Sequence, residues 1–129
     1  MNRAVLTLIP IALLTACGSP EPEADCEDAP PALLEQIGES ATVDDLAMGT
    51  GRAYLSPDYE QVWFVAAKFT VTGVDEEQTG VWATNRLDAP ETIMAVDGLA
   101  QEFTTFTPAD QSSAGIEVTD RAVETVKSC

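Results

Sequence analysis

The stretch Val62-Trp-Phe-Val-Ala-Ala-Lys-Phe-Thr-Val-Thr72 is the most strongly patterned segment of this 129-residue chain. Its odd-numbered positions are all apolar, whereas its even-numbered positions are apolar only as far as Ala66 and polar afterwards. Successive side chains of a strand point to opposite faces, so one face is expected to be buried throughout and the other only in its first half. The pattern predicts a central strand that is partly covered on its second side.

Upstream of this strand, the sequence predicts one helix and one short strand. Residues 30–38 begin with prolines, end at a glycine and carry one apolar face, which is typical of a short helix. Residues 42–46 have the spacing of a capping box and predict a brief helical turn. The glycines of 48–51 then indicate a break before a short strand at 53–55.

Downstream, acidic residues between two glycines predict a hairpin tip at 73–80, followed by strands at 81–84 and 92–96. Asp97 is placed to cap a helix that carries Leu99, Phe103 and Phe106 on one face. Residues 107–115 are expected to form a loop. A last helix is predicted from about residue 120, and its apolar face includes Cys129.

This order of elements predicts an α+β fold. We expect a small antiparallel sheet with helices against one of its faces, including the N-terminal and the C-terminal helix. No internal repeat is visible, and residues 29–129 are long enough for one domain with one hydrophobic core. The sequence therefore predicts a single α+β domain.

The first seventeen residues have the features of a secretory signal peptide. Arg3 precedes an apolar run that ends in small residues directly before Cys17. The run from 4 to 14 is about half of the ~20 residues that cross a bilayer, and it contains Pro10, so a permanent transmembrane helix is disfavoured. Plain secretion with cleavage at an Ala-x-Ala site is the closer alternative.

Leu14-Thr15-Ala16-Cys17 resembles the lipobox of bacterial lipoproteins. The resemblance implies that 1–16 is a signal peptide and that Cys17 is lipidated, for instance with palmitate, and becomes the mature N-terminus. Residues 17–28 would be a lipidated, acidic tether, and the protein would be extracytoplasmic and anchored to the cell membrane by lipid, since two acyl chains give stable anchoring. The segments 62–67 and 80–85, with the terminal cysteine, look like small secreted lipoproteins of unknown function from Gram-positive bacteria.

Once Cys17 is assigned to lipid, Cys26 and Cys129 remain as an even pair. In an oxidising compartment such a pair is expected to form a disulfide bond, here one that ties the two ends of the domain together. Two free thiols are the alternative. A redox role is less favoured because the chain has no Cys-x-x-Cys spacing.

The chain is strongly acidic, with 22 Asp and Glu against six Lys and Arg. Such a surface repels phosphate backbones and anionic lipid headgroups, which argues against nucleic-acid binding and leaves membrane attachment to the lipid. A cationic partner or a divalent metal is the functional interpretation of the charge. Solubility beside a negatively charged envelope is the simpler one.

Little catalytic chemistry is encoded. The chain has no histidine, which excludes catalytic sites of the Ser-His-Asp and Cys-His types. It also has no phosphate-binding glycine loop. Carboxylates remain, and a glycosidase would need two of them across a sugar-binding cleft, for which Asp44 with Asp45 and the 75–77 run are candidates. Asp75, Glu76 and Glu77 are also weak candidates for a metal site, against a solvated hairpin tip, and no cofactor is implied.

Aromatic residues are the other candidate binding groups. Trp63 and Trp82 fall on two strands that are expected to be adjacent, and paired tryptophans form either a ligand platform or core. The candidate binding set is Trp82, Tyr59, Asn85 and Arg86.

Three functions remain open. The leading hypothesis is a membrane-tethered, non-enzymatic binding module for an unidentified envelope protein or ligand, which would present an exposed aromatic patch around Trp82. The second is a carboxylate-dependent hydrolase of envelope polymers, which needs a concave pocket with two converging carboxylates. The third is a prophage-type exclusion lipoprotein.

Overall fold

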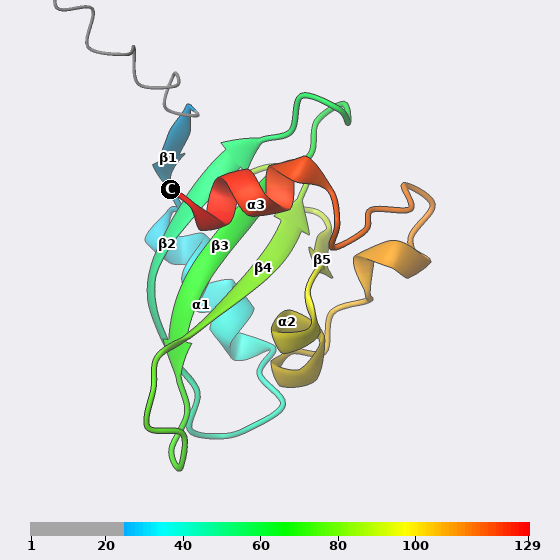
Figure 1. Ribbon diagram of the computed structural model, residues 1–129. Coiled ribbons are helices and arrows are strands. Elements are labelled where there is room, and N and C mark those ends of the chain that lie inside the picture. The colour runs from blue at the N-terminus through cyan, green and yellow to red at the C-terminus, as the bar shows by residue number, and fades with distance from the viewer. Residues whose placement is uncertain (1–24) are drawn as a thin grey trace, which may run out of the picture.

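The patterned strand lies in the middle of the fold. The computed structural model describes residues 25–129, so the predicted signal peptide and the predicted lipobox with Cys17 lie outside the described residues. One five-stranded antiparallel sheet has its strands in chain order (Figure 1). The strands are β1 (Cys26–Asp28), β2 (Ala47–Leu55), β3 (Trp63–Thr70), β4 (Gln78–Thr84) and β5 (Ile93–Ala95).

The burial of β3 follows the sequence pattern. Val65, Ala67 and Phe69 are buried on one face, and Phe64 and Ala66 are buried on the other. The outward positions that follow, 68 and 70, are exposed. The prediction of a central strand whose second side is only partly covered is therefore confirmed.

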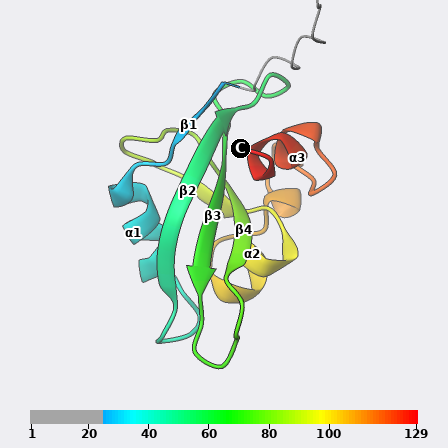
Figure 2. The same cartoon turned by 60° about the vertical axis from the view of Figure 1, so that its left-hand side comes forward.

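Helices cover both faces of the sheet, so the expectation that they share one face is wrong. On the face of Val65 lies helix α1 (Pro31–Glu39), which buries Leu33, Leu34 and Ile37. On the face of Phe64 lies α3 (Arg121–Lys127), which buries Ala122, Val123 and Val126. Figure 2 shows α1 and α3 on opposite sides of the sheet. The physical reason is that β3 and β4 are apolar on both faces, and each face needs cover from water.

The segment before β3 differs from its prediction. No helix forms at 42–46; this loop is instead held by hydrogen bonds from Thr42 to the backbone of Glu102 and Phe103. Strand β2 starts at Ala47 and runs through the predicted break, with an irregularity between Met48 and Gly51. A Cβ at Gly51 would lie 2.9 Å from Leu34 Cδ2, so this glycine allows α1 to pack closely on the strand.

The elements after β3 agree with the predictions more closely. Asp97 caps α2 (Gly98–Phe103), its carboxylate accepting a hydrogen bond from the backbone N–H of Ala100 at 2.9 Å. Phe106 lies beyond the end of this helix but still packs against the core. The predicted loop at 107–115 contains a short 3-10 helix, Ala109–Gln111.

A disulfide bond joins Cys26 to Cys129, as predicted, with 6.2 Å between their Cα atoms. Residues 26–28, expected as the end of the tether, instead form the edge strand β1, which pairs with residues 52–54 of β2. Figure 1 shows the C-terminus beside β1, so both ends of the described chain meet at one end of the sheet. Within residues 25–129, no helix has the length and apolarity needed to cross a membrane.

Candidate functional site

Trp82 is a core residue. Its side chain is 1% exposed, it packs edge-on against Phe69, and its indole N–H donates to Thr104 Oγ1 at 3.1 Å. Thr104 in turn donates to the carbonyl of Ala100 in α2. The expected exposed aromatic patch around Trp82 is therefore not present, because this ring closes the interface between β4 and α2.

Tyr59 lies on the other face of the sheet and fastens the β2–β3 loop to the start of α3. Its hydroxyl donates to Asp120 Oδ2 at 3.1 Å. Burial of the phenol, with the nearby carboxylate of Asp120, raises the pKa of Tyr59 above its usual value of 10.0. Next to it, Arg121 donates two hydrogen bonds to Asp58, at 2.7 and 2.9 Å, and these lower the pKa of the Asp58 carboxyl below 3.8.

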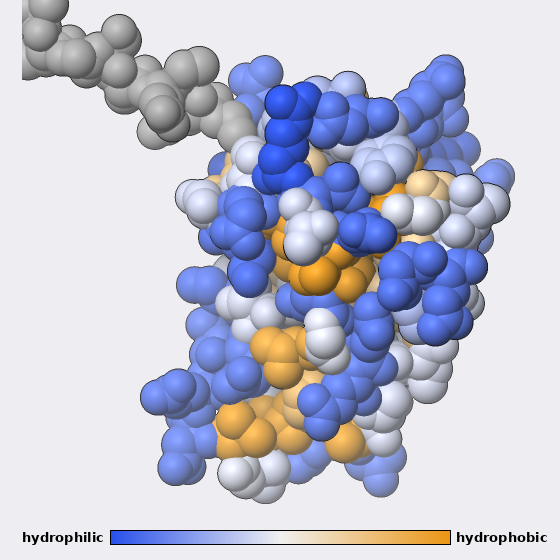
Figure 3. Space-filling view, turned by 45° about the vertical axis from the view of Figure 1, so that its right-hand side comes forward, coloured by the Kyte–Doolittle hydropathy of each residue, from blue (hydrophilic) through white to orange (hydrophobic). Residues whose placement is uncertain are grey.

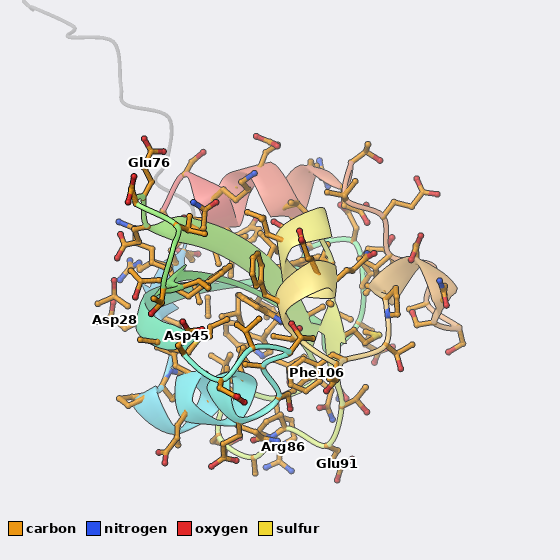
Figure 4. All side chains as sticks on the ribbon, turned by 90° about the horizontal axis from the view of Figure 1, so that it is seen from below. Asp28, Asp45, Glu76, Arg86, Glu91 and Phe106 are labelled. Atoms are coloured by element: carbon orange, nitrogen blue, oxygen red, sulfur yellow. A yellow bond between two sulfur atoms is a disulfide. The ribbon has the colours of Figure 1, made fainter. Side chains whose placement is uncertain are left out.

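Asn85 and Arg86 belong to the loop between β4 and β5. The side-chain carbonyl of Asn85 accepts hydrogen bonds from the backbone N–H groups of Glu91 and Thr92 and so shapes this loop. Arg86 is exposed and lies 3.5 Å from Asp88. Figure 4 shows Arg86 and Glu91 at the same margin of the molecule. The four residues predicted as a binding set therefore do not form one surface, since Trp82 is buried and Tyr59 packs on the opposite face.

The acidic run at 75–77 is an exposed hairpin tip. Glu77 lies 3.9 Å from Lys68, and the backbone carbonyl of Glu76 accepts a hydrogen bond from Gln78. The Glu76 side chain projects outward in Figure 4. Across residues 25–129, no three Asp, Glu, Cys or His side chains gather as metal ligands, so the weak metal candidates do not converge.

A shallow, open hollow of about 350 Å³ lies on the side of the molecule beside α2. Val96, Gly98 and Gln101 line it from the β5–α2 segment, and Asp110 and residues 117–119 line it from the segment before α3. We call this surface the lateral hollow. Figure 3, which brings this side of the molecule forward, shows apolar surface exposed among hydrophilic residues.

Local hydrogen bonds shape the walls of the lateral hollow. Glu117 accepts from the hydroxyl of Thr119 at 3.4 Å, and its backbone N–H donates to Asp120. Gln101 donates to the carbonyl of Val96 at 3.3 Å. Val96 is buried at 3% exposure, whereas Val118 is 50% exposed. The hollow thus combines two carboxylates, both from the segment before α3, with the amide of Gln101 and apolar side chains.

The carboxylates of the lateral hollow, Asp110 and Glu117, were not among the candidates from the sequence. The candidate carboxylates from the sequence, in the 44–45 and 75–77 runs, lie instead in the loop before β2 and in the β3–β4 hairpin. Asp110 and Glu117 are seven positions apart in the segment before α3, and both line the hollow where this segment lies beside α2. No sequence spacing indicates this juxtaposition.

Neither a protein-family model, nor a curated protein, nor a solved structure matches this chain.

Proposed function

We propose that this chain is an extracytoplasmic lipoprotein, anchored through Cys17, whose small domain binds a partner without catalysing a reaction. The observation that carries the proposal is the disulfide bond between Cys26 and Cys129. Structural disulfides form and persist in oxidising compartments, which is where a lipobox-like leader would deliver the domain. The bridge also uses both cysteines of the domain, which leaves Cys17 as the thiol for the acyl chains.

The arrangement of the domain supports a role in binding. The tether would enter at β1, and the disulfide bond joins the C-terminus to the same strand, so this end of the sheet would face the anchor. Helix α2 lies beside the sheet (Figure 1), and the open hollow next to it is accessible to a partner. The sheet itself, covered on both faces, serves as a rigid support.

The first test is the intact mass of the protein extracted from native membranes, with and without reduction and alkylation. We expect the mass of residues 17–129 plus lipid, and two thiols that become alkylated only after reduction. An unlipidated mass would contradict the anchor, and thiols that react without reduction would contradict the bridge.

The binding role needs a separate test in intact cells. A photo-crosslinker placed at Val118, which is 50% exposed at the rim of the lateral hollow, should give one discrete adduct. The matched control carries the crosslinker at Val74, which is 41% exposed in the hairpin tip. Equal adduct patterns from both positions, or none from Val118, would contradict a specific partner at this surface.

A second function is favoured by one observation, the presence of Asp110 and Glu117 in the same hollow. A carboxylate-dependent hydrolase of envelope polymers requires such a pair. Both residues are exposed, however, whereas a carboxyl group that acts as general acid is usually enclosed by apolar groups that raise its pKa. Release of sugars or peptides from envelope polymers by the wild-type protein, lost in both Asp110→Asn and Glu117→Gln, would favour the hydrolase over the binding module.

A further inference from the structure

We propose that the lateral hollow accepts an arginine or lysine side chain from an extended segment of a partner protein. The inference rests on the proposed binding function and names the chemistry of the partner. It follows from three features of the hollow: its concave shape, its pair of carboxylates and its apolar lining.

The charge of the hollow has one sign. Asp110 and Glu117 are its ionisable lining residues, and neither forms an ion pair in the part of the chain that the structure describes. By contrast, four of the five cationic side chains in residues 25–129 already lie within 4.0 Å of a carboxylate. The hollow is thus an anionic recess without an internal counter-charge.

The apolar lining selects among cations. Arginine and lysine have long aliphatic stems that pack on apolar surface while the charged head stays near water or a carboxylate. Val118, which is 50% exposed, would contact such a stem, and Asp110 and Glu117 would accept hydrogen bonds from its head. A bare divalent ion would gain nothing from the valine and would need more oxygen ligands.

Gly98 lines the hollow and leaves room for a side chain. A Cβ built on this glycine meets no atom within 4 Å. A larger side chain at position 98 therefore projects into the hollow without displacing the core. The acidity of the whole chain adds long-range attraction, because its net charge of −16 steers a basic partner towards it.

The test uses the full lipidated chain in zwitterionic detergent micelles. The probe is a five-residue peptide with blocked ends, with arginine at its centre and a valine on each side of the arginine. The control peptide has citrulline in place of arginine, which has nearly the same shape without the charge. We expect the arginine peptide to shift the backbone amide NMR signals of Gly98 and Thr119. We expect the citrulline peptide to bind several-fold more weakly, and high salt to weaken the arginine peptide.

Variants separate the hollow from general acidity. Asp110→Asn with Glu117→Gln should weaken the arginine peptide roughly three- to tenfold, as expected for two exposed ion pairs. Asp75→Asn with Glu76→Gln removes the same charge from the hairpin tip and should leave the affinity unchanged. Gly98→Leu should abolish the shifts at Thr119 while leaving the unfolding midpoint unchanged. If Gly98→Leu unfolds, the comparison of the two double variants, at 110 and 117 and at 75 and 76, still tests the proposal.

Several results would overturn the inference. They are equal weakening by the two double variants, equal binding of the citrulline peptide, shifts confined to another surface, or the same amide shifts produced by calcium chloride alone. These failures differ from failure of the proposed function. A discrete in-cell adduct at Val118 with no binding of the arginine peptide would support the binding function but with a partner of different chemistry. An unlipidated protein that still binds the arginine peptide would contradict the membrane anchor and support the proposed site.

Discussion

Removing the disulfide bond should cost the domain about a third or more of its stability. The bridge joins residues that are 103 positions apart, so it closes nearly the whole domain into one loop. In the chain-entropy model, closure of a loop of that length removes about 16 cal/mol/K from the unfolded ensemble, which is about 4.7 kcal/mol at room temperature. A small domain has a total of only about 5–15 kcal/mol.

The same figure predicts a shift in melting temperature. Globular proteins have an unfolding entropy of about 2.1 cal/mol/K per residue, or about 0.22 kcal/mol/K for the 105 described residues. A loss of about 4.7 kcal/mol therefore corresponds to a fall in Tm of about 20 °C.

The variant for this experiment is Cys26→Ala with Cys129→Ala, compared with the wild type in the same detergent. Guanidinium unfolding followed by tryptophan fluorescence reports on the core, because Trp82 is buried between β4 and α2. The wild type under reducing conditions should behave like the variant. A loss below about 1 kcal/mol, or a variant more stable than the reduced wild type by several kcal/mol, would refute the view that the bridge acts by restraining the unfolded chain.

Three further perturbations test the packing and one ion pair. Trp82→Phe should cost about 2–3 kcal/mol in urea unfolding, because it leaves a cavity and removes the hydrogen bond to Thr104. Gly80→Ala should cost about 1–3 kcal/mol, since its Cβ would lie 2.6 Å from the Trp82 ring. Gly98→Ala is the control: its Cβ meets no neighbour, so it should be neutral or slightly stabilising. Equal effects of the two substitutions would contradict the packing. The lowered pKa of Asp58 means that its ion pair with Arg121 stabilises the fold above the unfolded pKa near 3.8, and that this contribution is lost as pH falls through the folded pKa. Asp58→Asn should therefore be less stable than wild type at pH 6, and the difference should shrink as the pH falls below 3.8. A difference that stays constant or grows on acidification would point to another cause.

Local sequence patterns predicted most of the secondary structure. The alternation in 62–72 identified the central strand and the extent of its second buried face, because strand periodicity depends only on the chain and on water. Prolines before α1 and Asp97 before α2 marked helix starts for the same local reason. The cysteine count and spacing also predicted the bridge.

Tertiary structure decided what local pattern left ambiguous. The glycines at 49 and 51 indicated a break, but β2 continues through them. The glycine at 51 instead allows α1 to pack closely, because a side chain there would collide with Leu34. Trp82 could have been surface or core, and it is core because Thr104 of a distant segment satisfies its indole N–H.

The sequence by itself determined the strand, the bridge and the acidic character of this protein, since each depends on neighbouring residues, a residue count or a sum of charges. Which faces the helices cover, and which carboxylates share a recess, were decided only by the folded chain. Asp110 and Glu117 line the same hollow because α2 and the segment before α3 pack together, and such contacts between segments depend on the shape and volume of the whole core.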